Sequence, residues 1–332
     1  MKRAAFLNDN PDRLDYVYAM GRRDRVAQVT DLCDTVLTSK NLEEHGDAAA
    51  QVEVAFSTWG MPRLEPAQLD LLPKLEAVFY GAGSVKGFAP PLLERGIVVV
   101  SAWAANARPV AEFTLAQILL ACKGYFRNAR ECRSAEVRLS GRPATGPGVF
   151  GETIGIIGAG MVGRIVCELL QGFELNVVVC DPYLSAADAA ALGVRQVELD
   201  ELFKRSYVVS NHLPNLSSLE GYLTGEHFGS MREGATFINT GRGAQVREDE
   251  LIEVLGKRAD LTALLDVTFP EPPEAGSELY SLPNVELTSH IAGSINDEVV
   301  RMADYAIEEF GRWEAGEPLL YQVTADMLER MA

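Results

Sequence analysis

Three polar side chains, Arg242, Glu271 and His290, each follow an apolar run that predicts a β-strand. A histidine can give a proton to a carbonyl oxygen at neutral pH. A carboxylate beside it would orient the ring, and Glu271 and Glu274 are the candidates after Asp266. Arg242 stands between two glycines, which leave its planar cation room to bind a carboxylate. Alone, Arg242 could form a surface ion pair and Glu271 could be solvated, but their positions at successive strand ends favour one site for proton transfer to a bound anion.

The chain contains only four histidines, so each can be assessed separately. His45 and His227 lie in polar segments and are expected on the surface. His212 ends an apolar run and is expected to line a binding site. His290 also ends such a run, with Gly293 close behind it, and is the best candidate for acid–base work.

The turn that would organise these strands has glycines at Gly158, Gly160 and Gly163, the pattern GxGxxG. Before it, Thr153–Ile157 predicts a buried strand, and residues 162–172 have apolar positions at helical spacing. In a strand–turn–helix unit the glycines permit the tight turn, the approach of a pyrophosphate and close packing of helix on strand. A chance glycine-rich turn is the alternative when the pattern stands alone. With this context, we predict a Rossmann dinucleotide-binding unit, with phosphate at the helix N-terminus.

The next apolar run, residues 175–180, ends at Asp181. Its carboxylate would accept hydrogen bonds from the adenosine ribose hydroxyls and repel a 2′-phosphate. No Lys or Arg lies between Asp181 and Arg195 to bind such a phosphate. The sequence therefore predicts NAD as the cofactor in preference to NADP.

Composition excludes several other classes of protein. The 332 residues carry a net charge of −17, which opposes binding to nucleic acid or anionic membranes. No apolar stretch approaches the roughly 20 residues of a membrane span, and the N-terminus turns polar too early for a secretory signal. The five cysteines form no metal-binding pattern, so no metal is predicted. We expect a cytoplasmic protein.

The strand and helix signals predict an α/β protein with two domains. Residues 1–104 alternate strand-like and helical segments, which indicates a smaller flavodoxin-like parallel sheet. Residues 104–123 predict a long helix, and the polar stretch 127–148 is expected to be a loop. An amphipathic helix at 297–313 is expected to return to the first domain. The predicted division is 1–104 with 295–332 for a discontinuous substrate domain, and 105–294 for the Rossmann NAD-binding domain.

Two loops of the first domain, residues 57–61 and 81–84, follow predicted strands where ligands of parallel sheets bind. Backbone N–H groups of Gly83 and Ser84 could face a small anion. An ordinary turn explains these residues equally well.

Three bulky residues lie near the expected far end of a substrate: Trp59, Met61 and Trp103. They predict either a pocket for an apolar or carbohydrate-derived group or ordinary core packing. Arg63 is the only basic candidate nearby, so a phosphorylated substrate is less favoured.

Together these motifs resemble the D-isomer-specific 2-hydroxyacid dehydrogenase family over nearly the whole chain, most specifically from about residue 75 to 295. The resemblance rests on five segments: Gly158–Gly163 with Asp181, Ser210–Pro214, Asn239–Gly243, Asp266–Pro272 and Thr288–Gly293. Two departures are Val85–Gly87, where many relatives carry an acidic or amide residue, and Met161, where an arginine is common. Val110–Glu112 also fits, and the resemblance implies a homodimer formed through the helix near 105–123.

The resemblance implies NAD-dependent interconversion of a 2-oxo acid and a D-2-hydroxy acid in an interdomain cleft. Arg242 would fix the carboxylate and polarise the oxo group, His290 would protonate the oxygen, and Glu271 would orient His290. Gly83 and Ser84 would complete the carboxylate site. Cofactor contacts are implied at Gly158, Gly160, Met161, Val162, Asp181, His212, Leu213, Pro214, Thr240, Gly241, Asp266 and Gly293. The alternative is a non-catalytic NAD(H)-sensing protein or corepressor on the same fold.

Overall fold

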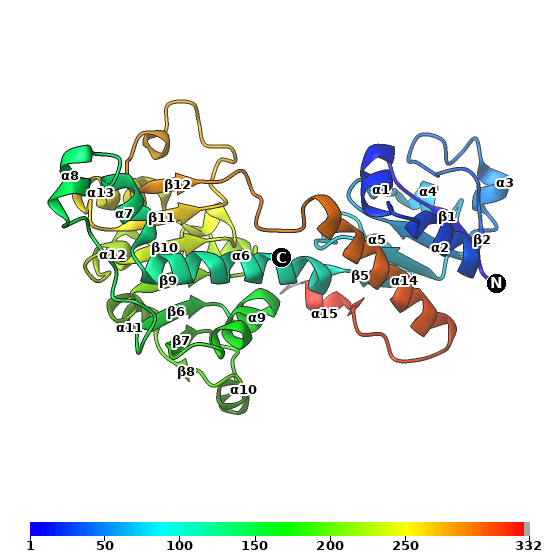
Figure 1. Cartoon of the computed structure of the whole chain (residues 1–332). Coiled ribbons are helices and arrows are strands. Elements are labelled where there is room, and N and C mark those ends of the chain that lie inside the picture. The colour runs from blue at the N-terminus through cyan, green and yellow to red at the C-terminus, as the bar shows by residue number, and fades with distance from the viewer. Residues whose placement is uncertain (329–332) are drawn as a thin grey trace. The chain divides into compact units, whose positions relative to one another are not determined.

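The computed structural model describes residues 1–328 and divides the chain into two compact units (Figure 1). Unit 1 comprises Met1–Asn106 and the segment from Ser294 onward, and unit 2 comprises Ala107–Gly293. The predicted divisions, after residues 104 and 294, fall within two residues of these positions. The assignment of substrate binding to unit 1 remains a prediction.

Unit 1 contains one sheet, whose strands are parallel apart from an antiparallel pair at one edge. Within residues 1–328 its strands are, in spatial order, β13 (Gln322–Val323), β5 (Val98–Ser101), β4 (Ala77–Tyr80), β3 (Val54–Ser57), β1 (Arg3–Phe6) and β2 (Asp31–Leu32). The order β2-β1-β3-β4-β5 is that of flavodoxin-like sheets, which confirms the predicted fold class. The antiparallel strand β13 was not predicted.

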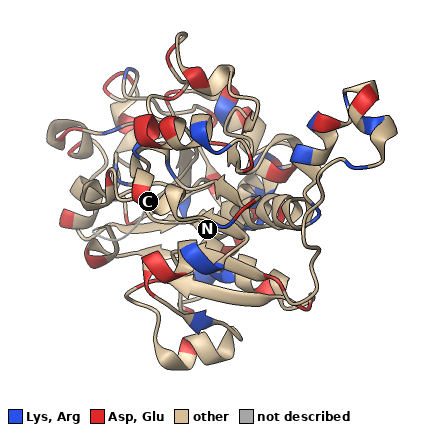
Figure 2. Ribbon diagram, turned by 90° about the vertical axis from the view of Figure 1, so that its left-hand side faces the viewer, with Lys and Arg blue, Asp and Glu red and all other residues tan. Residues whose placement is uncertain are grey.

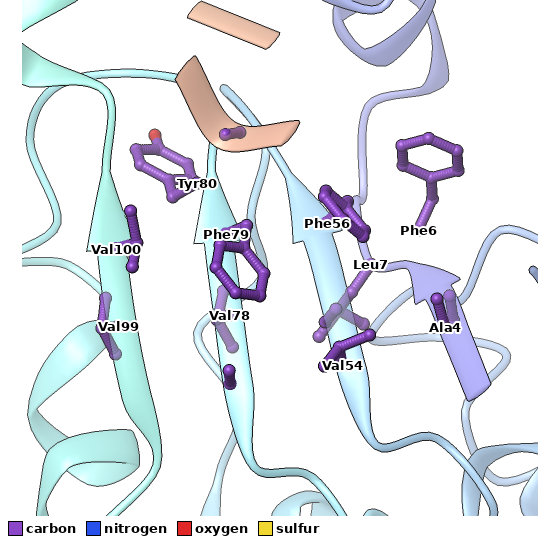
Figure 3. Packing of buried hydrophobic residues seen from close by; sticks show 14 of the residues in the cluster. Ala4, Phe6, Leu7, Val54, Phe56, Val78, Phe79, Tyr80, Val99 and Val100 are labelled. Atoms are coloured by element: carbon purple, nitrogen blue, oxygen red, sulfur yellow. The ribbon is translucent and has the colours of Figure 1, made fainter. Parts of the chain in front are cut away.

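The helices of unit 1 supply the residues that bury the sheet. They are α1 (Pro11–Val17), α2 (Arg22–Val29), α3 (Gly46–Ala49), α4 (Pro66–Leu69), α5 (Ala89–Glu94), η4 (Asn296–Val299), α14 (Val300–Glu314) and α15 (Ala325–Leu328). Figure 3 shows Phe56 and Phe79 side by side on neighbouring strands. Phe310 of α14 packs on both rings at 5.5 Å, so the C-terminal segment completes this core, as predicted for the amphipathic helix.

Unit 2 contains one parallel sheet. Its strands are β12 (Val285–Leu287), β11 (Thr262–Leu265), β10 (Thr236–Asn239), β9 (Val208–Asn211), β6 (Thr153–Ile157), β7 (Asn176–Cys180) and β8 (Arg195–Gln196), in spatial order. Strand order reverses between β6 and β9, which is the switch point where a Rossmann sheet binds its ligand. The predicted Rossmann fold is confirmed.

The helices of unit 2 include one long element, α6 (Trp103–Cys122), which begins in unit 1. The others are α7 (Tyr125–Glu131), α8 (Ala135–Ser140), α9 (Met161–Leu170), α10 (Ala186–Ala191), α11 (Leu199–Arg205), η1 (Ser217–Leu219), α12 (Gly225–Gly229), η2 (Gly243–Gln245), α13 (Glu248–Lys257) and η3 (Glu278–Tyr280).

The prediction of a loop at 127–148 was wrong in part, because α7 and α8 lie there. These helices are short and have no buried residue, so they carry no apolar periodicity. Local signals define α8 instead: the Ser134 side chain accepts the Val137 N–H, and Gly141 ends the helix in a left-handed conformation.

Charged residues fall mainly on helices and turns, whereas the strands in Figure 2 are mostly uncharged. The strands are apolar runs because helices cover parallel sheets on both faces. Within residues 1–328 no helix is both long enough and apolar enough to cross a membrane.

Candidate active site

The carboxyl ends of the unit 2 strands are aligned, which brings the predicted motifs to one edge of the sheet. Register pairs Ile157 with Asn211, Asn211 with Asn239, and Asn239 with Leu265. Leu265 in turn pairs with Leu287. The polar segments that follow these strands therefore begin at neighbouring positions.

The glycine turn joins β6 to α9 and depends on the absence of side chains. Gly158 has φ 88°, and a Cβ on it would meet the His212 carbonyl oxygen at 2.8 Å. A Cβ on Gly163 would meet the Gly158 carbonyl oxygen at 2.0 Å. Gly160 precedes α9 without a side-chain cap, so the N–H groups at the start of this helix, including those of Met161 and Val162, are not bound by a capping side chain. This arrangement fits a pyrophosphate.

Asp181 stands beside this turn at the end of β7. One carboxylate oxygen accepts the Ala159 N–H at 2.6 Å and the other accepts the Tyr183 N–H at 2.7 Å. The side chain thus ties the turn after β6 to the turn after β7. Its place matches that expected for a ribose-binding carboxylate.

His212 is a buried residue, 8% exposed, in the segment after β9. Its Nε2 lies 2.9 Å from Ser210 Oγ and its Nδ1 lies 3.5 Å from Thr240 Oγ1. Burial lowers the pKa of His212 to about 3, so its ring is neutral at physiological pH. This histidine supports the strand ends and cannot serve as an acid near neutrality.

Gln245 holds the adjoining backbone and was missed by the sequence analysis. Its Nε2 donates to the carbonyls of Leu213 and Pro214, at 3.0 and 2.7 Å. Its Oε1 accepts the Asn211 side-chain amide and the Arg242 N–H. Its position three residues after Arg242 was the only local signal, because the strands that it bridges are distant in sequence.

Arg242 leaves β10 in an extended conformation, and its Nη1 donates to the Gly241 carbonyl at 2.8 Å. The turn lies against the loop that carries Glu271, since a Cβ on Gly243 would meet the Thr268 carbonyl carbon at 2.0 Å. Burial lowers the pKa of the Arg242 guanidinium, and the charge of Glu271 opposes that shift. An arginine remains charged at physiological pH, so this half-buried cation is suited to binding an anion.

His290 lies beside Glu271, with 2.6 Å between His290 Nδ1 and Glu271 Oε1. Both side chains are partly exposed, at 47% and 42%. Glu271 therefore contacts the histidine and is also an electrostatic neighbour of Arg242. The sequence did not decide whether Glu271 or Glu274 is the carboxylate beside the histidine. In the structure Glu271 contacts the His290 ring.

The Asp266 side chain holds the His290 segment. Its carboxylate is buried and accepts the Thr288 hydroxyl at 2.6 Å and the N–H groups of Ile291 and Ala292 at 2.8 and 2.9 Å. Its carbonyl accepts the His290 N–H, and His290 itself has φ 60°. The predicted cofactor contacts of Asp266 and of Gly293, at the end of unit 2, remain predictions.

The other two histidines lie outside the cluster of Arg242, Glu271 and His290. His227 was expected on the surface, but its side chain is only 16% exposed. It stacks on Phe203 with 5.2 Å between ring centroids and accepts the Thr224 N–H at the start of α12. Apolar neighbours from another helix explain this difference. His45 is half-buried and precedes α3.

In unit 1, the loops after β3 and β4 are bonded to each other. Thr58 Oγ1 donates to the Gly81 carbonyl at 2.7 Å, and Ser101 Oγ donates to the carbonyls of Ala82 and Gly83. A Cβ on Gly83 would meet no atom within 4 Å, so its backbone faces open space, and Ser84 after it is exposed.

The three bulky residues of unit 1 are half-buried and pack against its core: Trp59, Met61 and Trp103. Each therefore contributes to core packing, which was one of the two predictions for these residues. Each also keeps some accessible surface.

Comparison with known proteins connects this geometry to a family. The model of the NAD-binding domain of the D-isomer specific 2-hydroxyacid dehydrogenases matches residues 115–292. The chain belongs to the D-isomer specific 2-hydroxyacid dehydrogenase family. Unit 2 contains the residues that match the family's NAD-binding domain, and Arg242, Glu271 and His290 all lie within them.

Two curated relatives of the chain illustrate the similarity. Hydroxypyruvate reductase from Thermotoga maritima is 32% identical over 65% of this chain and 70% of its own length. D-3-phosphoglycerate dehydrogenase from Archaeoglobus fulgidus is 31% identical over 71% of this chain and 44% of its own length. The match thus spans less than half of that phosphoglycerate dehydrogenase.

Two solved structures share the fold of this chain. A phosphoglycerate oxidoreductase from Rhizobium etli has a TM-score of 0.81 and 23% identity, with 98% of each chain covered. The apo D-mandelate dehydrogenase of Rhodotorula graminis has a TM-score of 0.79 and 21% identity, with 97% of each chain covered.

Proposed function

We propose that this protein reduces a 2-oxo acid to a D-2-hydroxy acid with NADH, and catalyses the reverse oxidation. The observation that carries the proposal is the 2.6 Å contact between His290 and Glu271, with the half-buried Arg242 beside the same loop. A cation for the substrate and a carboxylate-held imidazole for the proton are the two groups that this reaction needs from the protein.

Each of the three side chains has a distinct role in the proposed reaction. Arg242 binds the substrate carboxylate and polarises the oxo group. Glu271 holds Nδ1 of His290, which leaves Nε2 to deliver a proton to the oxygen as the carbonyl carbon gains a hydride. Oxidation returns the proton to Nε2. When bound, NADH supplies the hydride.

The residues of unit 2 fit the cofactor that the family uses. We propose that the N–H groups at the start of α9 bind the pyrophosphate and that Asp181 accepts hydrogen bonds from the adenosine ribose hydroxyls. The carboxylate of Asp181 would repel a 2′-phosphate, so NADH is preferred to NADPH.

We propose that unit 1 supplies the remaining substrate contacts. The open backbone at Gly83 and Ser84 would bind the carboxylate, and Trp59, Met61 and Trp103 would line the far end. We also propose that the chain forms a homodimer through the region of α6.

The test is a panel of 2-oxo acids assayed with NADH and NADPH, including glyoxylate, hydroxypyruvate and phenylpyruvate. We expect NADH oxidation with at least one acid. Arg242→Ala should lower kcat/KM roughly 10- to 100-fold, because a hydrogen bond to a charged group contributes about 1.5–3 kcal/mol. Tight NADH binding without turnover of any acid would favour the non-catalytic sensor.

A further inference from the structure

In unit 1 an arginine packs on the loop after β3, although the two are far apart in the sequence. Arg13 lies on α1, and its guanidinium carbon stands 5.8 Å from the centre of the Trp59 ring. Trp59 follows β3 and is half-buried against the core of unit 1. Contact with an aromatic face orients a guanidinium. Arg13 was not predicted from the sequence, and the prediction that Arg63 is the only basic residue near this loop was wrong.

Asn8 fixes the loop before α1, the helix that carries Arg13, to the loop that carries Trp59. This buried residue donates through Nδ2 to the carbonyls of Thr58 and Trp59, both at 3.2 Å. Its Oδ1 accepts the Asn10 N–H at 2.7 Å, just before α1. The pairing of Arg13 with Trp59 is therefore set by the backbone of both loops.

Gly60 makes this close approach possible. It has φ 101°, and a Cβ there would meet Asn8 Oδ1 at 2.5 Å and Asn10 Cβ at 2.8 Å. Its carbonyl accepts the Asp9 N–H at 2.8 Å. The loop after β3 thus packs on the loop after β1 with no room for a side chain, which makes the edge rigid.

The loop after β3 adjoins the loop after β4, which is proposed to bind the substrate carboxylate. Register pairs Ser57 with Tyr80, so the segments after β3 and β4 begin at neighbouring positions. Thr58, next to Trp59, donates to the Gly81 carbonyl. A substrate whose carboxylate is held at Gly83 and Ser84 can extend along the same edge toward Trp59.

The charge of Arg13 is not neutralised by an ion pair. Within residues 1–328 it has no carboxylate partner, whereas six other arginines of unit 1 do: Arg3, Arg22, Arg23, Arg25, Arg95 and Arg312. Arg63, exposed and two residues after Met61, also forms no ion pair among the described residues. The carboxylate of the nearby Asp9 is bonded to Ser39. Two arginines without a described ion-pair partner thus lie beside the loop after β3, in a chain whose net charge is −17.

We propose that Arg13, held over Trp59, is a specificity-determining residue that selects 2-oxo acids with a second anionic group, a carboxylate or a phosphate, at the far end. This inference rests on the proposed function and deepens it. An exposed planar cation offers several N–H donors to an anion. It already lies over the Trp59 ring, where an uncharged aromatic substrate would have to stack. The chemistry favoured here differs from the apolar or carbohydrate-derived group predicted from sequence.

The test compares substrates that differ only in the far group: 2-oxopentanoate with 2-oxoglutarate, and hydroxypyruvate with its 3-phosphate. We expect the wild type to have the higher kcat/KM for the member with the second anionic group in at least one pair, and that pair identifies carboxylate or phosphate. Arg13→Gln should lower kcat/KM for that substrate roughly 10- to 100-fold, mainly through KM, and leave its monoanionic partner within about 2-fold.

Two further variants separate charge from geometry. Arg13→Lys keeps a cation but loses the planar donors, so it should retain part of the preference. Arg138→Gln removes an exposed arginine of unit 2 and should leave both substrates unchanged.

The inference is overturned if the wild type prefers the monoanionic member of both pairs, or if Arg13→Gln lowers both members equally. In either case turnover of the monoanionic acids leaves the proposed function standing. Absence of turnover with every acid would overturn the proposed function and this inference with it.

Discussion

The contact between His290 and Glu271 gives the carboxylate two tasks, orientation and charge, that substitutions can separate. In Glu271→Gln the amide oxygen can still accept an N–H from the ring, but the negative charge is lost. In Glu271→Ala both are lost. We expect kcat/KM for reduction to fall in the order wild type, Glu271→Gln, Glu271→Ala, with roughly 10- to 100-fold lost in the alanine variant.

Glu274 provides the matched control, because it is an exposed carboxylate of the same loop. Glu274→Gln should keep wild-type kinetics. Equal loss in the variants of Glu271 and Glu274 would mean that only the net charge of the loop matters, and would remove Glu271 from the site.

His212 gives a prediction about stability and pH. Burial lowers its pKa from 6.5 to about 3. Between these two pH values the folded protein keeps the ring neutral, whereas the unfolded chain binds a proton. The stability due to the neutral ring is fully present above pH 6.5 and is lost as the pH falls toward 3, by at most about 1.4 kcal/mol per pH unit. The free energy of unfolding of His212→Gln should therefore depend less steeply on pH between 6.5 and 4 in denaturant titrations.

His45 serves as the control for this experiment. It is half-buried and precedes α3 in unit 1, so it belongs to no strand of unit 2. His45→Gln should retain the wild-type slope. An unchanged slope in His212→Gln would show that other groups cause the acid sensitivity.

At this scale the sequence predicts which residues lie at strand ends but not which ones touch. Arg242, Glu271 and His290 could be identified because parallel strands end at one edge. The contacts of Asn8, Arg13 and Gln245 could not, because each joins loops that only the folded sheet brings together. His227 was misplaced for the same reason, since Phe203 lies on another helix.

At the scale of elements, the turn after β10 must lie against the loop after β11 for the site to form. A Cβ on Gly243 would meet the carbonyl carbon and oxygen of Thr268 at 2.0 and 2.1 Å, so Gly243→Ala has to push these two segments apart. We expect kcat/KM to fall about 100-fold, because a displacement near 1 Å has that effect on catalytic groups. NADH affinity, measured by fluorescence titration, should change less.

A second glycine shows whether the effect is local. Gly256 lies within α13, and a Cβ there would meet nothing within 4 Å. Gly256→Ala should keep full activity and gain slightly in thermal stability. Full activity in Gly243→Ala would mean that the two segments can separate without harm.

Most strands could be predicted because helix-covered parallel strands are continuous apolar runs. The two-residue strands β2, β8 and β13 could not, because two residues show no periodicity. α7 and α8 were missed because neither buries a residue, so only their capping positions mark them.

At the scale of the whole molecule, chain length and the alternation of signals predict two α/β units, and the structure gives each unit its own core. Strand order is not visible in the sequence. In the folded unit 2, β6 lies between β9 and β7, so the strand order runs outward in both directions from β6 and the switch point lies at β6 and β9. The cofactor motif is thus placed by topology as well as by its glycines.

Four exposed apolar side chains lie between residues 120 and 150, on α6 and the segment that follows it. Leu120, Tyr125, Leu139 and Phe150 are 40%, 51%, 86% and 80% exposed. A second copy of the chain bound at this segment would cover such side chains, as the proposed homodimer requires. We therefore expect the wild type to sediment as a dimer at micromolar concentrations. Leu139→Lys should shift it toward the monomer, because a charge in an apolar interface must be desolvated. Leu320→Lys, at a 57% exposed leucine of unit 1, should remain dimeric, and a monomeric wild type or equal dissociation of both variants would contradict an interface at α6.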